Sequence, residues 1–537
     1  MRALLAALPI ALLLALLLGT RLGAAKAAWI ALAAALVLTF SIFGFTADDG
    51  ASAGQNLTGV AAEGAFIAAT ILWILLPALA IHELQIRSGA LDVLRGALAS
   101  AAPDAAGKAL LIGWFFALFL EGAAGFGTPL AVAAPMLVAV GVAPVPAVAG
   151  VLLAHVAGVT FGAIGTPLLA QAELTTASLA GLTRYTALLV LPLAWLPALL
   201  LLRAERPGSG GPLLWRHAVW AVVLFCAPFA AVAMWVGPEL PTLAGALLGG
   251  IAFVVVLRRR AQGRRVPRRA LLRAATPYLA LIALILATRL IPPVKAAAMS
   301  ATLSWDLAGG YTGSLLPLYH PGTMLFAALL VSAGIQRAAP SEIARAILGA
   351  AVRLAPAVVA LLAMLALSRL MLHAGMIDAL ARGAVSGVGA AWPAVAPAVG
   401  ALGSFVTGSA TASNILFTNL QDQAAASLGL PVAAILAAQT VGAAIGNAIC
   451  PHNIIAGAAA VGAAGRRGDP AAHAARMRAH AAHRGPPCAR AHPPVAVNIV
   501  FRSRHGDDTL DLPPASATHF PTKQRWPCRH TPATGPA

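Results

Sequence analysis

Long apolar stretches recur from residue 3 to residue 448, and they constrain the fold more than any other feature of the chain. A helix needs about 20 mostly apolar residues to cross the hydrocarbon core of a bilayer. Of the 537 residues, 60% are hydrophobic and only 10% are charged. We therefore predict an all-α polytopic membrane protein with about 12–14 transmembrane segments. The candidate segments are Ala3–Leu18, Ala27–Phe45, Gly64–Ile81, Leu110–Leu120, Ala131–Val140, Val145–Ile164, Leu182–Leu202, Ala218–Val236, Leu240–Leu257, Ala274–Ile291, Pro321–Gly334, Leu354–Leu372, Trp392–Val406 and Val432–Ala448.

The formal net charge of +18 is a topology signal. Eight arginines and no acidic residue stand in the run Arg258–Arg273. Lys and Arg mark the cytoplasmic loops of membrane proteins, so this run is predicted to be a basic cytoplasmic loop. It divides an N-terminal membrane half, residues 1–257, from a C-terminal membrane half, residues 274–465. A chain with so few charges lacks the basic surface of a nucleic-acid-binding protein, and its predicted macromolecular environment is the lipid bilayer.

The segment 466–537 has a different composition from the rest of the chain. It holds seven of the 13 histidines, 11 basic and four acidic residues, and no helical or strand periodicity. Such a composition predicts a disordered, basic, His/Pro-rich tail. A shifted reading frame in GC-rich DNA would give the same composition. Neither its histidines nor the four cysteines of the chain show the spacing of metal ligands, so no metal site is predicted.

Two pairs of glycine- and proline-rich interruptions divide the apolar chain. Phe119–Pro129 reads FLEGAAGFGTP and is followed by Phe161–Pro167, FGAIGTP. Phe405–Asn414 reads FVTGSATASN and is followed by Gly442–Asn453, GAAIGNAICPHN. Pro129 and Pro167 are 38 residues apart, as are Ser413 and Pro451. We interpret this as a duplicated unit, with re-entrant hairpins or broken helices near 110–141 and 392–420.

Paired interruptions in corresponding halves are typical of the midplane binding site of a secondary transporter. The N-termini of half-helices present free N–H groups and a positive dipole end, which suit a carboxylate. Small hydroxyl and amide side chains add hydrogen-bond donors at the same places. The alternative is that the small residues only permit close helix packing. The candidate substrate-binding residues are Gly125, Gly127, Thr128, Ser409, Thr411, Ser413, Asn414 and Asn447.

Ionisable residues inside the membrane are functional candidates by default. Glu121 follows an almost purely apolar run, and His155 lies in the middle of a predicted span. We predict that both take part in proton coupling. The alternatives are a carboxylate that caps a half-helix and a histidine with a purely structural role. Arg369 is a candidate partner for a substrate carboxylate, although it could instead pair with Asp378.

The interruptions also carry a resemblance. The runs Phe119–Pro129, Phe161–Pro167 and TGSATASNILFTNLQ, which starts at Thr407, resemble those of the L-lactate permease family. The resemblance implies uptake of L-lactate, with D-lactate and glycolate, by proton symport across the cell inner membrane. It also implies two inverted repeats with re-entrant hairpins, a small monocarboxylate as substrate, and a proton gradient instead of a cofactor.

Three positions depart from the family pattern. Ala410 stands where many members have Asp, His155 where the family has Asn, and Asn447 where it has Lys. The residues therefore leave open a carrier of the same architecture that is coupled to sodium or moves another organic or inorganic anion. A membrane-embedded enzyme would need a catalytic motif such as HExxH or Gly-x-Ser-x-Gly, and the spans contain neither.

Overall fold

A computed structural model describes residues 1–20, 22–45, 51–102, 104–125, 127–205, 212–258 and 267–462. The tail 466–537 and residues 259–266, half of the predicted loop Arg258–Arg273, lie outside these residues. The first half comprises α1 (Arg2–Gly19), α2 (Ala24–Leu38), η1 (Thr39–Phe43), α3 (Ala53–Arg87), α4 (Ala90–Ala99), α5 (Ala105–Leu110), η2 (Leu111–Phe116), α6 (Ala117–Ala123), α7 (Thr128–Ala139), α8 (Pro144–Gly158), η3 (Ala163–Gly165), α9 (Thr166–Ala172), α10 (Leu179–Leu193), α11 (Trp195–Glu205), α12 (Pro212–Trp235) and α13 (Pro241–Arg258).

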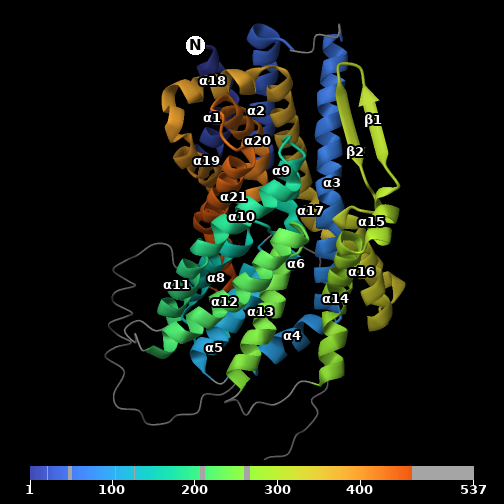
Figure 1. Cartoon of the computed structure of the whole chain (residues 1–537), viewed down its shortest axis with the longest axis vertical. Helices are drawn as coiled ribbons and strands as arrows, with labels where there is room; N and C mark the ends of the chain where they lie inside the picture. Colours follow the sequence, from blue (N-terminus) through green and yellow to red (C-terminus); the bar gives the residue numbers. More distant parts are fainter. Residues whose placement is uncertain are drawn as a thin grey trace, which may run out of the picture. The chain divides into compact units, whose positions relative to one another are not determined.

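The second half has a small β-hairpin near its start. It comprises α14 (Arg268–Leu290), α15 (Pro292–Met299), β1 (Leu303–Leu307), β2 (Tyr311–Leu315), α16 (Pro321–Gln336), α17 (Pro340–His373), α18 (Met376–Val388), η4 (Gly389–Ala391), α19 (Trp392–Thr407), α20 (Ala410–Ser427), α21 (Val432–Ile449) and α22 (Pro451–Ala460). The two strands are antiparallel, with Leu303 paired with Leu315. Figure 1 shows this hairpin beside the long helix α3.

The predicted all-α membrane architecture is confirmed. Ten helices in the described part of the chain are long and apolar enough to cross a membrane, and the number is eleven if α8 and α9, which are bent by 42° relative to each other, are counted as one span. The other three of the fourteen predicted segments are apolar helices of 10–17 residues: Thr128–Ala139, Pro241–Leu257 and Pro321–Gln336. The expected 12–14 segments thus correspond to helices, and the three short ones account for the smaller number of full-length spans.

The two interrupted regions fold in parallel ways. In the first, α6 and α7 form a hairpin, and the broken helix α8–α9 follows. In the second, α19 and α20 form a hairpin, and α21 and α22 follow with a break at Cys450. The packing between the regions is reciprocal, because α7 contacts α22 while α20 contacts α9, and α8 contacts α21 between them. Two copies of one unit related by a two-fold axis would pack in this way.

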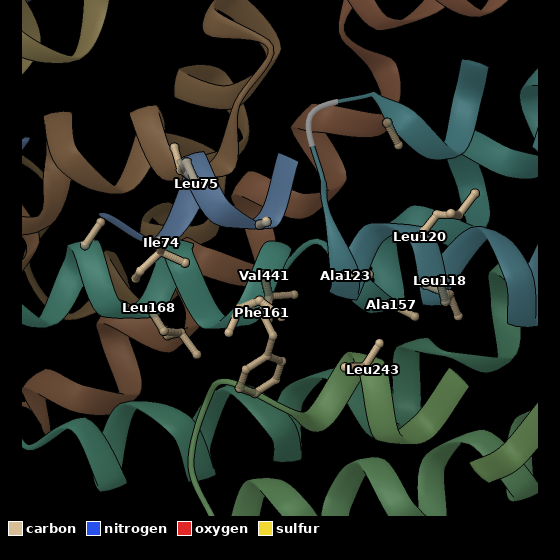
Figure 2. Packing of buried hydrophobic residues seen from close by; sticks show 14 of the residues in the cluster. Ile74, Leu75, Leu118, Leu120, Ala123, Ala157, Phe161, Leu168, Leu243 and Val441 are labelled. Carbon is tan, nitrogen blue, oxygen red and sulfur yellow. The ribbon is translucent and has the colours of Figure 1, made fainter. Parts of the chain in front are cut away.

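Buried apolar side chains surround the break between α8 and α9. Figure 2 shows Phe161 among aliphatic residues from α3, α6, α8, α9, α13 and α21. The ring of Phe161 is fully buried and contacts the ring of Phe229 edge to face, with centroids 5.2 Å apart. Non-helical backbone is tolerated at membrane depth only where protein buries it or water lines it, and this apolar packing buries one side of the break.

Helices α19 and α21 approach each other through glycines. A Cβ atom on Gly442 would lie 1.9 Å from the carbonyl oxygen of Pro397, and one on Gly400 would lie 2.0 Å from that of Gln439. Small residues allow such backbone contact between membrane helices, where van der Waals packing drives association. The contact fixes α21, and with it Asn447 on the same helix, against the second hairpin.

We predict that Gly442→Ala destabilises the protein, because the added methyl group forces α21 away from α19. Overpacking of this kind costs about 1–3 kcal/mol. The apparent melting temperature of the detergent-purified protein should therefore fall. The matched control is Gly334→Ala on α16, where no atom lies within 4 Å of the added Cβ. An equal change in both variants would contradict this account of the α19–α21 contact.

Candidate functional site

A cavity of about 350 Å³ lies where the two hairpin tips meet the two broken helices. Both interrupted regions contribute to its wall; the region from α6 to α9 is called the first repeat below, and the region from α19 to α22 the second repeat. The described lining residues are Glu121, Gly125, Gly127, Leu130, His155, Val159, Gly162, Ala163, Thr166 and Pro167 from the first repeat, and Gly408, Ser409, Ala410, Thr411, Asn447, His452, Asn453 and Ala456 from the second.

The first-repeat wall contains two turns of the same design. Gly127 and Gly165 precede α7 and α9 with φ angles of 74° and 77°, a left-handed conformation that glycine adopts without strain. A Thr-Pro pair follows each glycine, and proline is well suited to the first turn of a helix. The hydroxyl of Thr128 donates to the carbonyl of Gly125 at 2.8 Å, and that of Thr166 donates to the carbonyl of Ala163. The threonines thus hold the two turns closed.

The second-repeat wall begins at the N-terminus of α20. Ser409 is the N-cap residue, and its side-chain oxygen accepts a hydrogen bond from the backbone N–H of Ala412 at 3.2 Å. Ala410 and Thr411 occupy the first turn and line the cavity. The first backbone N–H groups of a helix have no partner within the helix and carry a partial positive charge. This end of the cavity is therefore suited to an anion.

Two asparagines brace the tip of the second hairpin. The Asn447 side-chain nitrogen donates to the carbonyl of Gly408 at 2.9 Å. The Asn453 side-chain nitrogen donates to the backbone carbonyl of Asn447, also at 2.9 Å. These bonds satisfy carbonyl groups that the breaks free from the helical pattern, and they connect α21 and α22 to the hairpin.

The charges around the cavity are unbalanced. Among the described lining residues, Glu121 is the single carboxylic acid, His155 and His452 are the imidazoles, and there is no Lys or Arg. Glu121 is 7% exposed and makes no hydrogen bond or ion pair with a described residue, and Nε2 of His155 has no partner. The other two buried acids of the described chain, Glu63 and Glu239, each pair with an arginine.

The structure brings together seven of the eleven predicted site residues. Those that line the cavity are Gly125, Gly127, Ser409, Thr411, Asn447, Glu121 and His155. Thr128, Ser413, Asn414 and Arg369 are not among the lining residues. Thr128 closes the first turn, as described above. The hydroxyl of Ser413 donates to the carbonyl of Gly400 at 2.8 Å, in α19, the other helix of its own hairpin.

Asn414 belongs to a fully buried polar network between the repeats. Its side-chain nitrogen donates to the carbonyl of Pro167 and contacts the hydroxyl of Thr440, both at 3.0 Å. The Thr440 hydroxyl in turn donates to Gln171 of α9 at 3.1 Å. Because Pro167 lies in the cavity wall, Asn414 acts on the site indirectly, by positioning the first-repeat break against α20 and α21.

Three polar lining residues, Thr166, His452 and Asn453, are absent from the predicted set. The sequence carries a signal for Thr166, because Thr166-Pro167 repeats the pair Thr128-Pro129. Asn453 ends the second interruption, so the motif included it. No spacing rule indicates that its side chain reaches back to Asn447, because this depends on the angle at the break before α22.

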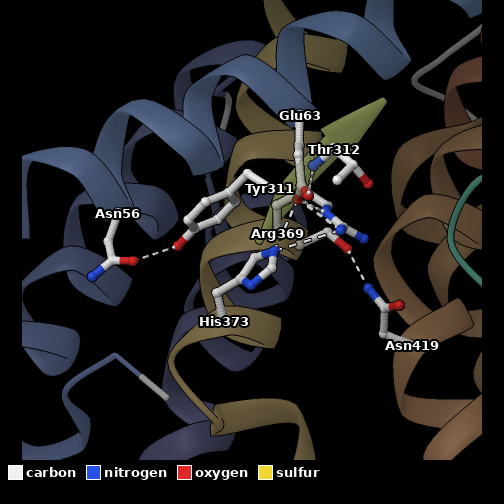
Figure 3. Close-up of polar contacts among 8 residues, drawn as sticks. Asn56, Glu63, Tyr311, Thr312, Arg369, His373 and Asn419 are labelled. Carbon is white, nitrogen blue, oxygen red and sulfur yellow. Dashed lines mark hydrogen bonds and ion pairs between the residues drawn. The ribbon is translucent and has the colours of Figure 1, made fainter. Parts of the chain in front are cut away.

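Arg369 lies in a separate polar cluster on α3 and α17 (Figure 3). Its guanidinium pairs with the Glu63 carboxylate at 2.6 Å, and His373 contacts the same carboxylate oxygen at 2.8 Å. The backbone N–H of Thr312 on β2 donates to the other Glu63 oxygen at 3.4 Å, and Tyr311 donates to Asn56 at 3.0 Å. The cluster fixes the β-hairpin to α3.

The chain is similar to known permeases along most of its length. A family model described as L-lactate permease matches residues 2–309 and 308–472. An L-lactate permease of Streptococcus iniae is 29% identical over 450 residues, covering 80% of this chain and 92% of that protein. An L-lactate permease of Escherichia coli K12 is 29% identical over 450 residues, with 74% and 80% covered. A glycolate permease of the same strain is 28% identical over 456 residues, also with 74% and 80% covered.

We predict that Arg369→Gln destabilises the protein, because it leaves the Glu63 carboxylate buried beside one fewer cation. Loss of one partner of a buried ion pair costs about 3–5 kcal/mol, whereas removal of both is less costly. Arg369→Gln should therefore lower the apparent melting temperature of the purified protein, and adding Glu63→Gln should restore part of it.

The control for this prediction is Arg95→Gln, which breaks the exposed Arg95–Asp92 pair and should change the melting temperature little. If Arg369→Gln kept the wild-type melting temperature but lost lactate binding, Arg369 would be a substrate ligand and the structural assignment would be wrong.

Proposed function

The chain belongs to the L-lactate permease family, and from this premise we propose that it takes up L-lactate, with D-lactate and glycolate, by proton symport. Membership makes it a multi-pass transporter of the plasma membrane, in keeping with its apolar helices. The choice of substrates and the coupling to protons are the proposal.

The cavity supports a small monocarboxylate as the substrate. The N-terminus of α20 lies at the cavity, and so do the N-terminal residues His452 and Asn453 of α22. Helix N-termini bind carboxylates through backbone N–H groups and the helix dipole. The hydroxyl groups of Ser409 and Thr411 add neutral polar contacts, which cost less to desolvate than an ammonium or guanidinium group.

The observation that carries the proton coupling is the charge balance of the cavity. A lactate anion beside an ionised Glu121 would place two negative charges in a site whose described lining has no Lys or Arg. Like charges in a low-dielectric site disfavour ionisation, so one of the two carboxyl groups must hold a proton when lactate is bound. The loaded site then carries one negative charge instead of two, and the proton travels with the substrate. We assign the relay of that proton to His155, which lines the same cavity and whose Nε2 has no partner.

The position of the cavity between the repeats supports alternating access. In carriers built from repeats, the substrate site lies near the midplane, and rocking of one unit against the other opens it to either side. Here each wall belongs to a different repeat. Relative movement of the repeats would therefore open the cavity without dismantling either wall.

We predict that Glu121→Gln abolishes accumulation of L-lactate driven by a pH gradient but preserves exchange of internal for external lactate. Glutamine resembles the protonated acid, so the site can load substrate but cannot release the proton. Uptake of labelled lactate into vesicles with an imposed pH gradient, with and without sodium, measures the first property, and counterflow at equal pH measures the second.

The matched control is Asp306→Asn, at an exposed acid on β1, which should accumulate lactate like the wild-type protein. Wild-type accumulation by Glu121→Gln would exclude Glu121 as the proton carrier. Wild-type uptake that required sodium and ignored the pH gradient would establish the sodium-coupled alternative instead.

A further inference from the structure

We infer that Asn447 and Asn453 form a pair of hydrogen-bond acceptors that recognises the 2-hydroxyl group of the substrate. This inference rests on the proposed function and assigns to two named side chains the selection of 2-hydroxy acids over other small monocarboxylates. Asn453 is the residue that the inference adds to the predicted site.

The backbone around the pair fixes the orientation of both side-chain amides. Each of them contacts a backbone carbonyl oxygen, that of Gly408 for Asn447 and that of Asn447 itself for Asn453, both at 2.9 Å. A carbonyl oxygen can only accept hydrogen bonds, so the NH₂ group of each amide must face it. Rotating either amide by 180° would bring two oxygens together.

This orientation leaves the two amide oxygens available. No described residue donates a hydrogen bond to either oxygen, and both residues line the cavity. The Asn453 oxygen lies beside the second hairpin tip, 3.8 Å from the place that a Cβ atom on Gly408 would occupy. In the inferred arrangement the two oxygens form an acceptor surface of the cavity near the N-terminus of α20, where the carboxylate is proposed to bind.

An acceptor surface selects a ligand that brings a donor. The hydroxyl of a 2-hydroxy acid can donate to an amide oxygen while its carboxylate occupies the helix N-terminus. An unsubstituted acid such as propionate offers no donor, and a 2-oxo acid such as pyruvate brings another acceptor oxygen. A site built to bond a substrate hydroxyl discriminates strongly against analogues without it, because its own polar group is left unpaired.

The test compares acids as competitors of labelled L-lactate uptake by the wild-type carrier. The central probe is 2-fluoropropionate, which is close to lactate in shape but lacks the O–H donor. One hydrogen bond is worth about 1 kcal/mol, so we expect 2-fluoropropionate and propionate to compete about five- to tenfold more weakly than lactate. Pyruvate should be at least as weak. Equal competition by lactate and 2-fluoropropionate would overturn the inference without any variant.

The variant Asn453→Ala tests the assignment. In this protein the ratio of the 2-fluoropropionate inhibition constant to the lactate inhibition constant should fall toward one, and the ratio is independent of how much folded carrier is present. The control is Asn419→Ala, which removes a buried amide of α20 that donates to Ser368 away from the cavity, and it should keep the wild-type ratio.

Three other outcomes would overturn the inference in distinguishable ways. An unchanged ratio of inhibition constants in Asn453→Ala would show that Asn453 does not recognise the hydroxyl group. If the ratio of inhibition constants stayed unchanged but lactate uptake by Asn453→Ala became dependent on the sodium concentration, the two oxygens would be cation ligands and not hydroxyl acceptors. If the wild-type carrier showed no pH-driven lactate uptake at all, the proposed function would fail first, and the inference with it.

Discussion

Helices that are interrupted inside a membrane leave backbone N–H and C=O groups without their helical partners. In lipid, every backbone polar group needs a partner within the protein. The chain supplies these partners from short side chains: Thr128 and Thr166 donate to carbonyls in the first repeat, and Asn447 donates to the tip of the second hairpin. The same interruptions leave helix N-termini pointing at a shared cavity. The binding site is thus a consequence of how the breaks are stabilised.

The distribution of buried charge separates the structural from the functional acids. Glu63 and Glu239 are each bonded to an arginine, so their charges are compensated where they lie. Glu121 faces the cavity without a described partner. An uncompensated acid at membrane depth is costly, and such residues mark ion and proton pathways. The cost is understandable if the proton that neutralises Glu121 is part of the transport cycle.

The sequence was sufficient for the all-α membrane fold and for the four interruptions that line the cavity, but not for the direction of individual side chains. Glycine and proline within apolar chain mark the breaks locally, which is why all four interruptions meet at the cavity. Ser413 and Asn414 lie within one turn of Thr411 yet face away from the cavity, because successive residues of a helix point about 100° apart and the rotation of α20 is set by its packing. Arg369 pairs with Glu63, 306 positions away, whereas the sequence offered only its neighbour Asp378 as a partner.

If lactate and a proton occupy the cavity together, protons must be taken up when lactate binds, and their number can be measured. Calorimetric titration of the purified carrier in two buffers with different ionisation enthalpies gives this number. We expect proton uptake that approaches one per lactate as the pH is raised, and none in Glu121→Gln. Lactate binding to the wild-type protein without proton uptake at any pH would contradict this expectation.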